Sequence, residues 1–121
     1  MPRPVLEESR IHPALRESVA GLHAATLREV QDAVAGQAVV VVGMAMNPYC
    51  RRARRALEGA GIAHRYLEYG SYFSQWRRRN AIKMWSGWPT LPMVFVKGML
   101  VGGCDDLQKL IASGELQRLL A

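Results

Sequence analysis

Two cysteines are the residues of this sequence best suited to covalent chemistry. Cys50 follows Asn47-Pro48-Tyr49, which carries the Asn and Pro preferred at the first positions of a helix. A thiol near a helix N-terminus has a lowered pKa, because the helix dipole and free N–H groups stabilise the thiolate that attacks disulfides. Cys104 stands between Gly102-Gly103 and Asp105-Asp106, at a second expected helix start. Two cysteines are far too few for the disulfide framework of a secreted protein, so we expect both in a reduced protein.

Each cysteine also has an interpretation without chemistry. We expect Cys50 at the third helical position, where it packs as a small hydrophobic residue beneath a site, is an accessible catalytic thiol, or is a site of modification or metal binding. Cys104 either supplies only its backbone N–H or takes a redox or ligand role. A disulfide between the two requires Cα atoms within about 7 Å of each other, and at this level all of these alternatives stay open.

The segment from Trp88 to Asp106 constrains the fold more than any other. The two prolines of Pro89–Pro92 exclude a helix, because each proline ring fixes φ and removes a backbone donor. The apolar run Met93–Val96 has strand composition, Lys97-Gly98 predicts a hairpin turn, and a second strand follows. Gly102-Gly103 then permits a close backbone approach, and the Asp pair after it can cap a helix. We expect this segment to present backbone groups and one carboxylate at a shared edge.

Hydrophobic periodicity predicts the elements that position these segments. Apolar residues three or four apart predict one helix from Pro13 to Gly36, and the run Ala38–Val42 predicts a strand buried on both faces. The other expected elements are a helix from Asn47 to Gly61, a strand Ile62–Tyr69, a helix Tyr72–Trp85 capped by Ser71, and a final helix bent at Gly114. A βαβ unit, a helix and an antiparallel ββα unit make a thioredoxin-like α/β fold, a four-stranded mixed β-sheet flanked by helices, with an extra N-terminal helix.

The chain is expected to be a single domain behind a short leader. Its 121 residues suffice for one core. Prolines interrupt the beginning, so we assign residues 1–24 to a partly helical N-terminal extension and residues 25–121 to the domain. The first residues lack the apolar core of a signal peptide, and no apolar run approaches the ~20 residues needed to cross a bilayer. We expect a reduced, cytoplasmic protein with no membrane partner.

The chain is basic, with a formal net charge of +6 and a pI near 9.9. This charge favours anionic small molecules, and it leaves acidic protein partners as an alternative. Two helix faces carry most of the arginines, and we interpret them as solvated surfaces: Arg51, Arg52, Arg54 and Arg55, and Arg77, Arg78 and Arg79. No base-stacking motif or recognition-helix signature accompanies them, so nucleic acid is not an expected partner.

Several motifs resemble those of the glutaredoxin family, over roughly residues 25–120. Trp88-Pro-Thr-Leu-Pro92 resembles the family's turn before its third strand, in which the second proline is cis. Gly102–Asp105 resembles its Gly-Gly-Cys-Asp motif. Ile82-Lys83, followed by Trp85-Ser86, resembles the single-cysteine (monothiol) branch. The resemblance implies a thioredoxin-like fold with a groove for glutathione.

The resemblance also implies a role in glutathione binding for each matching position. The backbone of Leu91 would pair with the cysteinyl part of the tripeptide, as an added strand does. The Cys104 N–H and Asp105 would hold the γ-glutamyl end, and Lys83 with Arg79 would meet the glycyl carboxylate. The residues implied to bind glutathione are Tyr49, Arg79, Lys83, Leu91, Pro92, Gly103, Cys104 and Asp105.

One motif departs from the family pattern. Asn47-Pro-Tyr-Cys50 stands where dithiol relatives have Cys-Pro-Tyr-Cys and monothiol relatives have Cys-Gly-Phe-Ser, so Asn47 occupies the position of the nucleophile. A carboxamide neither attacks a disulfide nor ligates iron as a thiolate does, so a [2Fe–2S] cluster is not expected and no metal ligand is assigned. Met44 stands near the position of a lysine in the monothiol branch. Cys50 is the catalytic candidate that remains.

The predicted function is that of a glutaredoxin-like protein that binds glutathione and takes part in thiol–disulfide redox homeostasis. Its oxidoreductase activity is expected to be weak or absent unless Cys50 acts, which leaves open whether the chain is an enzyme or a pseudoenzyme. The alternative is a non-catalytic iron–sulfur or protein-interaction adaptor related to monothiol glutaredoxins.

Overall fold

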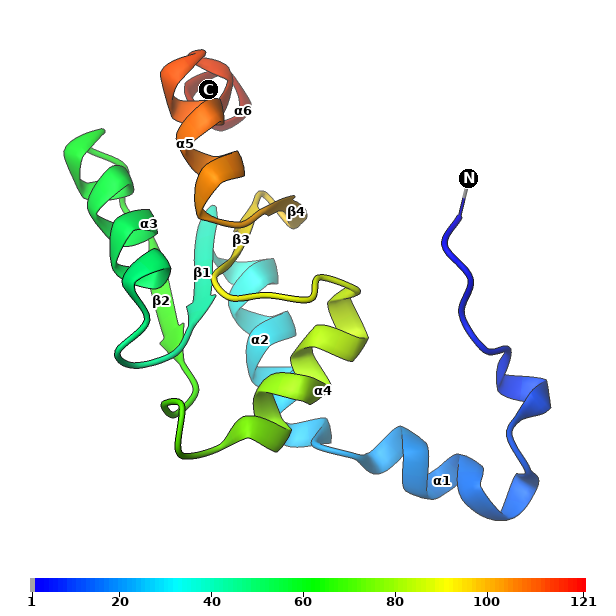
Figure 1. Ribbon diagram of the computed structural model, residues 1–121. Coiled ribbons are helices and arrows are strands. Elements are labelled where there is room, and N and C mark those ends of the chain that lie inside the picture. Colours follow the sequence, from blue (N-terminus) through cyan, green and yellow to red (C-terminus); the bar gives the residue numbers. More distant parts are fainter. Residues whose placement is uncertain (1) are drawn as a thin grey trace.

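Four short strands form a mixed sheet at the centre of the molecule. The computed structural model describes residues 2–121, and its strands are β1 (Val39–Gly43), β2 (Arg65–Glu68), β3 (Met93–Val96) and β4 (Met99–Gly102). Their order is β2-β1-β3-β4, with β1 parallel to β2 and antiparallel to β3, and β4 antiparallel to β3. The predicted four-stranded mixed sheet is therefore confirmed, including the hairpin β3–β4 (Figure 1).

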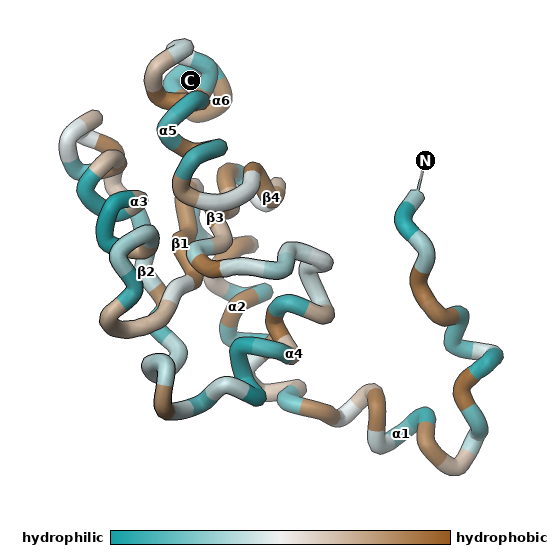
Figure 2. The backbone as a smooth tube through the Cα atoms, viewed as in Figure 1, coloured by the Kyte–Doolittle hydropathy of each residue, from teal (hydrophilic) through white to brown (hydrophobic). Residues whose placement is uncertain are grey.

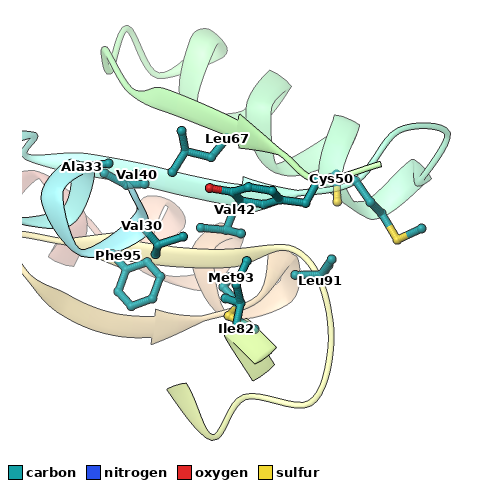
Figure 3. Packing of buried hydrophobic residues seen from close by; sticks show 12 residues of the cluster. Val30, Ala33, Val40, Val42, Cys50, Leu67, Ile82, Leu91, Met93 and Phe95 are labelled. Atoms are coloured by element: carbon teal, nitrogen blue, oxygen red, sulfur yellow. The ribbon is translucent and has the colours of Figure 1, made fainter. Parts of the chain in front are cut away.

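Helices cover both faces of this sheet, except for the first α-helix, which buries no residue. They are α1 (Pro13–Gly21), α2 (Ala24–Gly36), α3 (Pro48–Gly59), α4 (Trp76–Ser86), α5 (Cys104–Ala112) and α6 (Glu115–Leu120), after a short 3-10 helix η1 (Glu8–Arg10). Successive side chains of a strand point to opposite faces. Val40 and Val42 of β1 accordingly pack in a cluster with residues of α2 and α4 (Figure 3), whereas Val39 and Val41 pack with residues of α3, α5 and α6. All of β1 is buried, as its β-branched run predicts.

The single helix predicted from Pro13 to Gly36 is wrong, because the chain breaks into α1 and α2. His23 precedes α2 in the left-handed conformation, with φ of 51°. α1 buries no residue, and its Leu15 and Val19 are 55% and 45% exposed, while α2 buries three side chains. Figure 2 shows the hydrophobic residues of α1 lying away from the sheet. Apolar spacing continues across the break, so periodicity alone predicts one helix.

The helix predicted from Tyr72 begins later, at Trp76, and Ser71 does not cap it. Instead, the Ser71 N–H donates to the Ser74 hydroxyl at 3.1 Å. Such local serine hydrogen bonds compete with helix formation. Gln75, with φ of 56°, immediately precedes α4. The stretch between β2 and α4 is therefore a loop, and Tyr72 lies on it.

The other predicted boundaries need smaller changes. α3 begins at Asn47-Pro48 as expected, and α4 ends at the left-handed Gly87, whose N–H donates to the Lys83 carbonyl. β2 is shorter than predicted, and the bend at Gly114 is a break between α5 and α6. Within residues 2–121, no helix is both long and apolar enough to cross a bilayer. The division of the chain after residue 24 stays a prediction.

Candidate functional site

A groove with a volume of about 530 Å³ opens where the β1–α3 loop, the segment before β3 and the start of α5 meet. Small-molecule sites typically have volumes of roughly 300–1,000 Å³. The groove is lined by Met44, Asn47, Tyr49, Tyr72, Lys83, Trp88, Pro89, Thr90, Leu91, Pro92, Gly103, Cys104, Asp105 and Asp106. Every residue predicted to bind a ligand is among them except Arg79.

Asn47 is the N-cap of α3, and its side chain is already engaged. Its carboxamide oxygen accepts hydrogen bonds from the backbone N–H groups of Tyr49 at 2.9 Å and Cys50 at 3.1 Å. These are the donors that would stabilise a thiolate at a helix N-terminus. In this chain they bind a neutral acceptor, so the first helical turn is satisfied without a nucleophile.

Cys50 lies beneath the groove rather than in its lining. The residue is 2% exposed and belongs to the cluster that packs against α2 and α4, where Figure 3 shows its sulfur among apolar side chains. Burial raises the pKa of the Cys50 thiol, although a backbone hydrogen bond from Met44 acts in the opposite direction. A thiol that is buried and mostly protonated is a poor nucleophile. The geometry supports the packing interpretation of Cys50, not the accessible thiol.

The peptide edge before β3 forms one wall of the groove. The Leu91–Pro92 peptide bond is cis. Leu91 precedes the first residue of β3 that pairs with β1, Met93, so its N–H and C=O lie outside that ladder. An extended ligand can pair with such backbone groups as an added strand.

The start of α5 forms the facing wall. The Gly103 N–H donates to the Asp106 carboxylate at 3.0 Å, so Asp106 provides the helix cap and Asp105 stays exposed in the groove. Cys104 is 5% exposed, and burial, followed by the Asp105 charge, raises the pKa of its thiol. Cys104 therefore offers the groove its backbone rather than a thiolate.

The two walls lie against each other at Gly103. A Cβ atom on Gly103 would lie 3.5 Å from the Pro92 carbonyl oxygen and 3.6 Å from Nε1 of the Trp88 indole. The predicted shared edge of backbone groups and one carboxylate is therefore present in the structure.

Arg79 is a correction to the predicted ligand set. It is 6% exposed, and its guanidinium donates to the backbone carbonyls of Tyr69, at 2.9 Å, and Ser74. These bonds hold the loop before α4 in place. Lys83, from the same helix, does line the groove and is partly exposed. Of the two predicted cations, only Lys83 is positioned to meet a ligand carboxylate.

Sequence reasoning missed several lining residues. The sequence pattern predicts Tyr72 in a helix, and no motif indicates that this residue lines a site. Trp88, Pro89 and Thr90 were named only as parts of a turn. Met44 has an apolar side chain that is 7% exposed, and its residue type alone does not place it in the groove.

The residues at the groove do not fit an iron–sulfur cluster. Such clusters are held by cysteine thiolates. Asn47 is a carboxamide, and burial raises the pKa of both thiols, Cys50 and Cys104. Across residues 2–121 no three His, Cys, Asp or Glu side chains are grouped closely enough to hold a metal ion.

Comparisons with known proteins agree with this geometry. The family model described as Glutaredoxin matches residues 39–101. A Glutaredoxin-like protein of Dictyostelium discoideum is 48% identical over 94 residues, which cover 78% of this chain and 76% of that protein. Glutaredoxin-C4, chloroplastic, of Oryza sativa subsp. japonica is 32% identical over 94 residues, covering 78% of this chain and 71% of the relative.

Solved structures of glutaredoxins have the same fold. Oxidized glutaredoxin 2 from Chlamydomonas reinhardtii superposes with a TM-score of 0.68 at 31% identity, covering 81% of this chain and 92% of that chain. A buckwheat glutaredoxin–glutathione complex superposes with a TM-score of 0.72 at 25% identity, covering 82% and 90% respectively. The chain belongs to the glutaredoxin family and has its thioredoxin-like fold.

Proposed function

We propose that this protein binds glutathione in the groove and takes part in thiol redox homeostasis with weak or absent oxidoreductase turnover. The observation that carries the proposal is the groove itself: the Leu91-Pro92 edge and the α5 start face each other, with Asn47 at the helix start beside them. The buckwheat relative of similar fold is known as a complex with glutathione, which supports the choice of ligand.

Each part of glutathione has a complementary group in the groove. The cysteinyl backbone pairs with the free N–H and C=O of Leu91. The γ-glutamyl end meets the N-terminus of α5, where free N–H groups favour a carboxylate and Asp105 favours an ammonium group. The glycyl carboxylate meets Lys83. The net charge of +6 favours the approach of this anionic tripeptide.

Weak turnover follows from the position of the thiols. In thiol–disulfide exchange a thiolate attacks one sulfur of a disulfide and expels the other as a thiolate. Asn47 has no such group, and burial raises the pKa of the Cys50 thiol beneath it. The protein therefore binds the tripeptide without a well-placed sulfur to exchange with it.

Calorimetric titration with reduced glutathione tests the proposal. We expect a saturable binding isotherm with one site, which Asp105→Lys weakens because it places a like charge against the ligand ammonium. Lys109→Glu, on the same helix but outside the groove lining, is the matched charge-change control and should retain binding. Absence of detectable binding by the folded protein at millimolar glutathione would remove the proposal.

A further inference from the structure

We infer that the groove favours glutathione thioethers, in which an apolar group is attached to the sulfur, and that Tyr49 and Tyr72 receive this group. The inference rests on the proposed function, because the tripeptide part of the ligand is held as described above. It adds the chemical class of the preferred ligand and the residues that select it.

An uncharged, largely apolar wall lies on the Asn47 side of the groove. The lining contributed by the β1–α3 segment and by the loop before α4 consists of Met44, Asn47, Tyr49 and Tyr72, whereas the charged lining residues belong to α4 and α5. The groove therefore has charged groups for the two ends of a tripeptide and a separate wall that suits an apolar substituent.

The two tyrosines of this wall remain exposed in the protein, whereas Met44 is 7% exposed. Tyr49 and Tyr72 are 50% and 56% exposed. The Ala45 N–H donates to the Gly70 carbonyl at 2.7 Å, which ties the two loops together. Exposed aromatic side chains that line the same groove are typical of a surface that a ligand covers.

The chemistry at Asn47 accepts a thioether as readily as a disulfide or a free thiol, so the apolar wall decides the preference. With the cysteinyl backbone on Leu91, the ligand sulfur lies toward the start of α3. The Asn47 oxygen there is committed to two backbone N–H groups, at 2.9 and 3.1 Å. Asn47 forms no covalent bond to sulfur, so a sulfur that is already alkylated and cannot exchange loses no covalent interaction. Binding involves no covalent step.

Titrations with reduced glutathione, S-methylglutathione and S-hexylglutathione test the inference. We expect S-hexylglutathione to bind at least about tenfold more tightly than S-methylglutathione, because each added methylene buries apolar surface on the wall. Tyr72→Ala should lower this hexyl-to-methyl affinity ratio severalfold. The control Met99→Ala, an exposed residue on β4 that does not line the groove, should preserve the ratio.

The possible outcomes separate the inference from the proposed function. If glutathione binds but the hexyl compound binds no better than the methyl compound, the inference is wrong and the proposed function stands. If S-hexylcysteine binds as tightly as S-hexylglutathione, apolar contact alone explains the gain and the inference is also wrong. If none of the three tripeptides binds the folded protein, both statements fail.

Discussion

Asn47 caps α3 at the position where the motif resemblance leads us to expect a reactive thiol. Its carboxamide oxygen caps α3 through two backbone N–H groups, a role that typically contributes about 0.5–2 kcal/mol to stability. The helix start predicted from Asn-Pro is therefore correct, and the same residue explains both a stable helix and the missing nucleophile. Cys50, one turn further, is part of the core.

Arg79 and Lys83 show that the sequence does not predict which side chains of one helix are buried and which face the groove. Arg77, Arg78 and Arg79 follow one another on a helix, so each points about 100° away from the previous one. Only the packing of α4 decides which of them is buried. A motif can therefore place the helix beside the groove, but it does not show that Arg79 turns toward the loop.

The different surroundings of Arg79 and Lys83 predict that one substitution lowers stability and the other weakens glutathione binding. Arg79→Ala should lower the free energy of unfolding by about 1–3 kcal/mol, because the Tyr69 and Ser74 carbonyls lose a buried donor. Lys83→Ala should leave stability nearly unchanged and weaken glutathione binding about three- to tenfold, since one partly exposed charge contact is lost. Urea denaturation and calorimetry measure the two quantities. If Arg79→Ala weakened glutathione binding and left the free energy of unfolding unchanged, Arg79 would be a ligand-binding residue after all.

At the scale of elements, the strands and the hairpin were predictable because strong local markers bound them. The prolines of the Pro89–Pro92 turn, Gly98 in the hairpin and the β-branched run of β1 each restrict the backbone in a known way. The breaks before α2 and α4 were not predictable. His23 and Gln75 adopt positive φ without being glycine, and residue type does not mark such positions.

The junction of β1 and α3 provides a test of packing between elements. A Cβ atom on Gly43 would lie 2.8 Å from the Tyr66 ring and 2.9 Å from the Cys50 sulfur. Gly43→Ala should therefore lower the free energy of unfolding by about 1–3 kcal/mol through overpacking.

Gly36→Ala is the matched control for this substitution, because the added methyl group has no heavy atom within 4 Å beyond its chain neighbours and the backbone of its own helix. It should change stability by no more than about 0.5 kcal/mol. Equal denaturation midpoints for the two variants would show that Gly43 does not pack against Cys50 as described.

At the scale of the whole molecule, segments far apart in the sequence meet in one groove. The main ones are the β1–α3 loop, the segment before β3 and the start of α5. The motifs around Leu91 and Cys104 allowed both main walls to be predicted, because they fix local backbone geometry. Tyr72 was not predicted to line the groove, because it lies on a loop whose sequence pattern predicts a helix. The sequence therefore predicted Tyr49 on the apolar side of the site, but only the structure places Tyr72 there.

The buried thiols and phenols predict how the stability of the whole molecule depends on pH. Burial is the first cause of the raised pKa values of Cys50, Cys104, Tyr66 and Tyr69. The folded state then retains protons that the unfolded chain releases above about pH 8.5 for cysteine and 10 for tyrosine. Their contribution to stability is complete below about pH 8, and the free energy of unfolding should fall as pH rises toward 10.5.

Urea denaturation across this pH range measures the fall. Tyr69→Phe should make it shallower, because one group whose pKa is raised in the folded state is removed, whereas Tyr72→Phe, at an exposed position, should leave it as in the parent protein. A pH-independent free energy of unfolding between pH 8 and 10.5 would contradict the raised pKa values.

We propose that the groove binds glutathione although position 47, where a nucleophilic thiol is expected, carries an asparagine. Reduction of hydroxyethyl disulfide by glutathione, measured for the parent protein, Cys50→Ser and Asn47→Cys, tests it most directly. We predict that the parent protein and Cys50→Ser both stay near the uncatalysed rate, and that Asn47→Cys turns over well above it. Turnover by the parent protein that disappears in Cys50→Ser, or a folded Asn47→Cys variant without activity, would contradict the account.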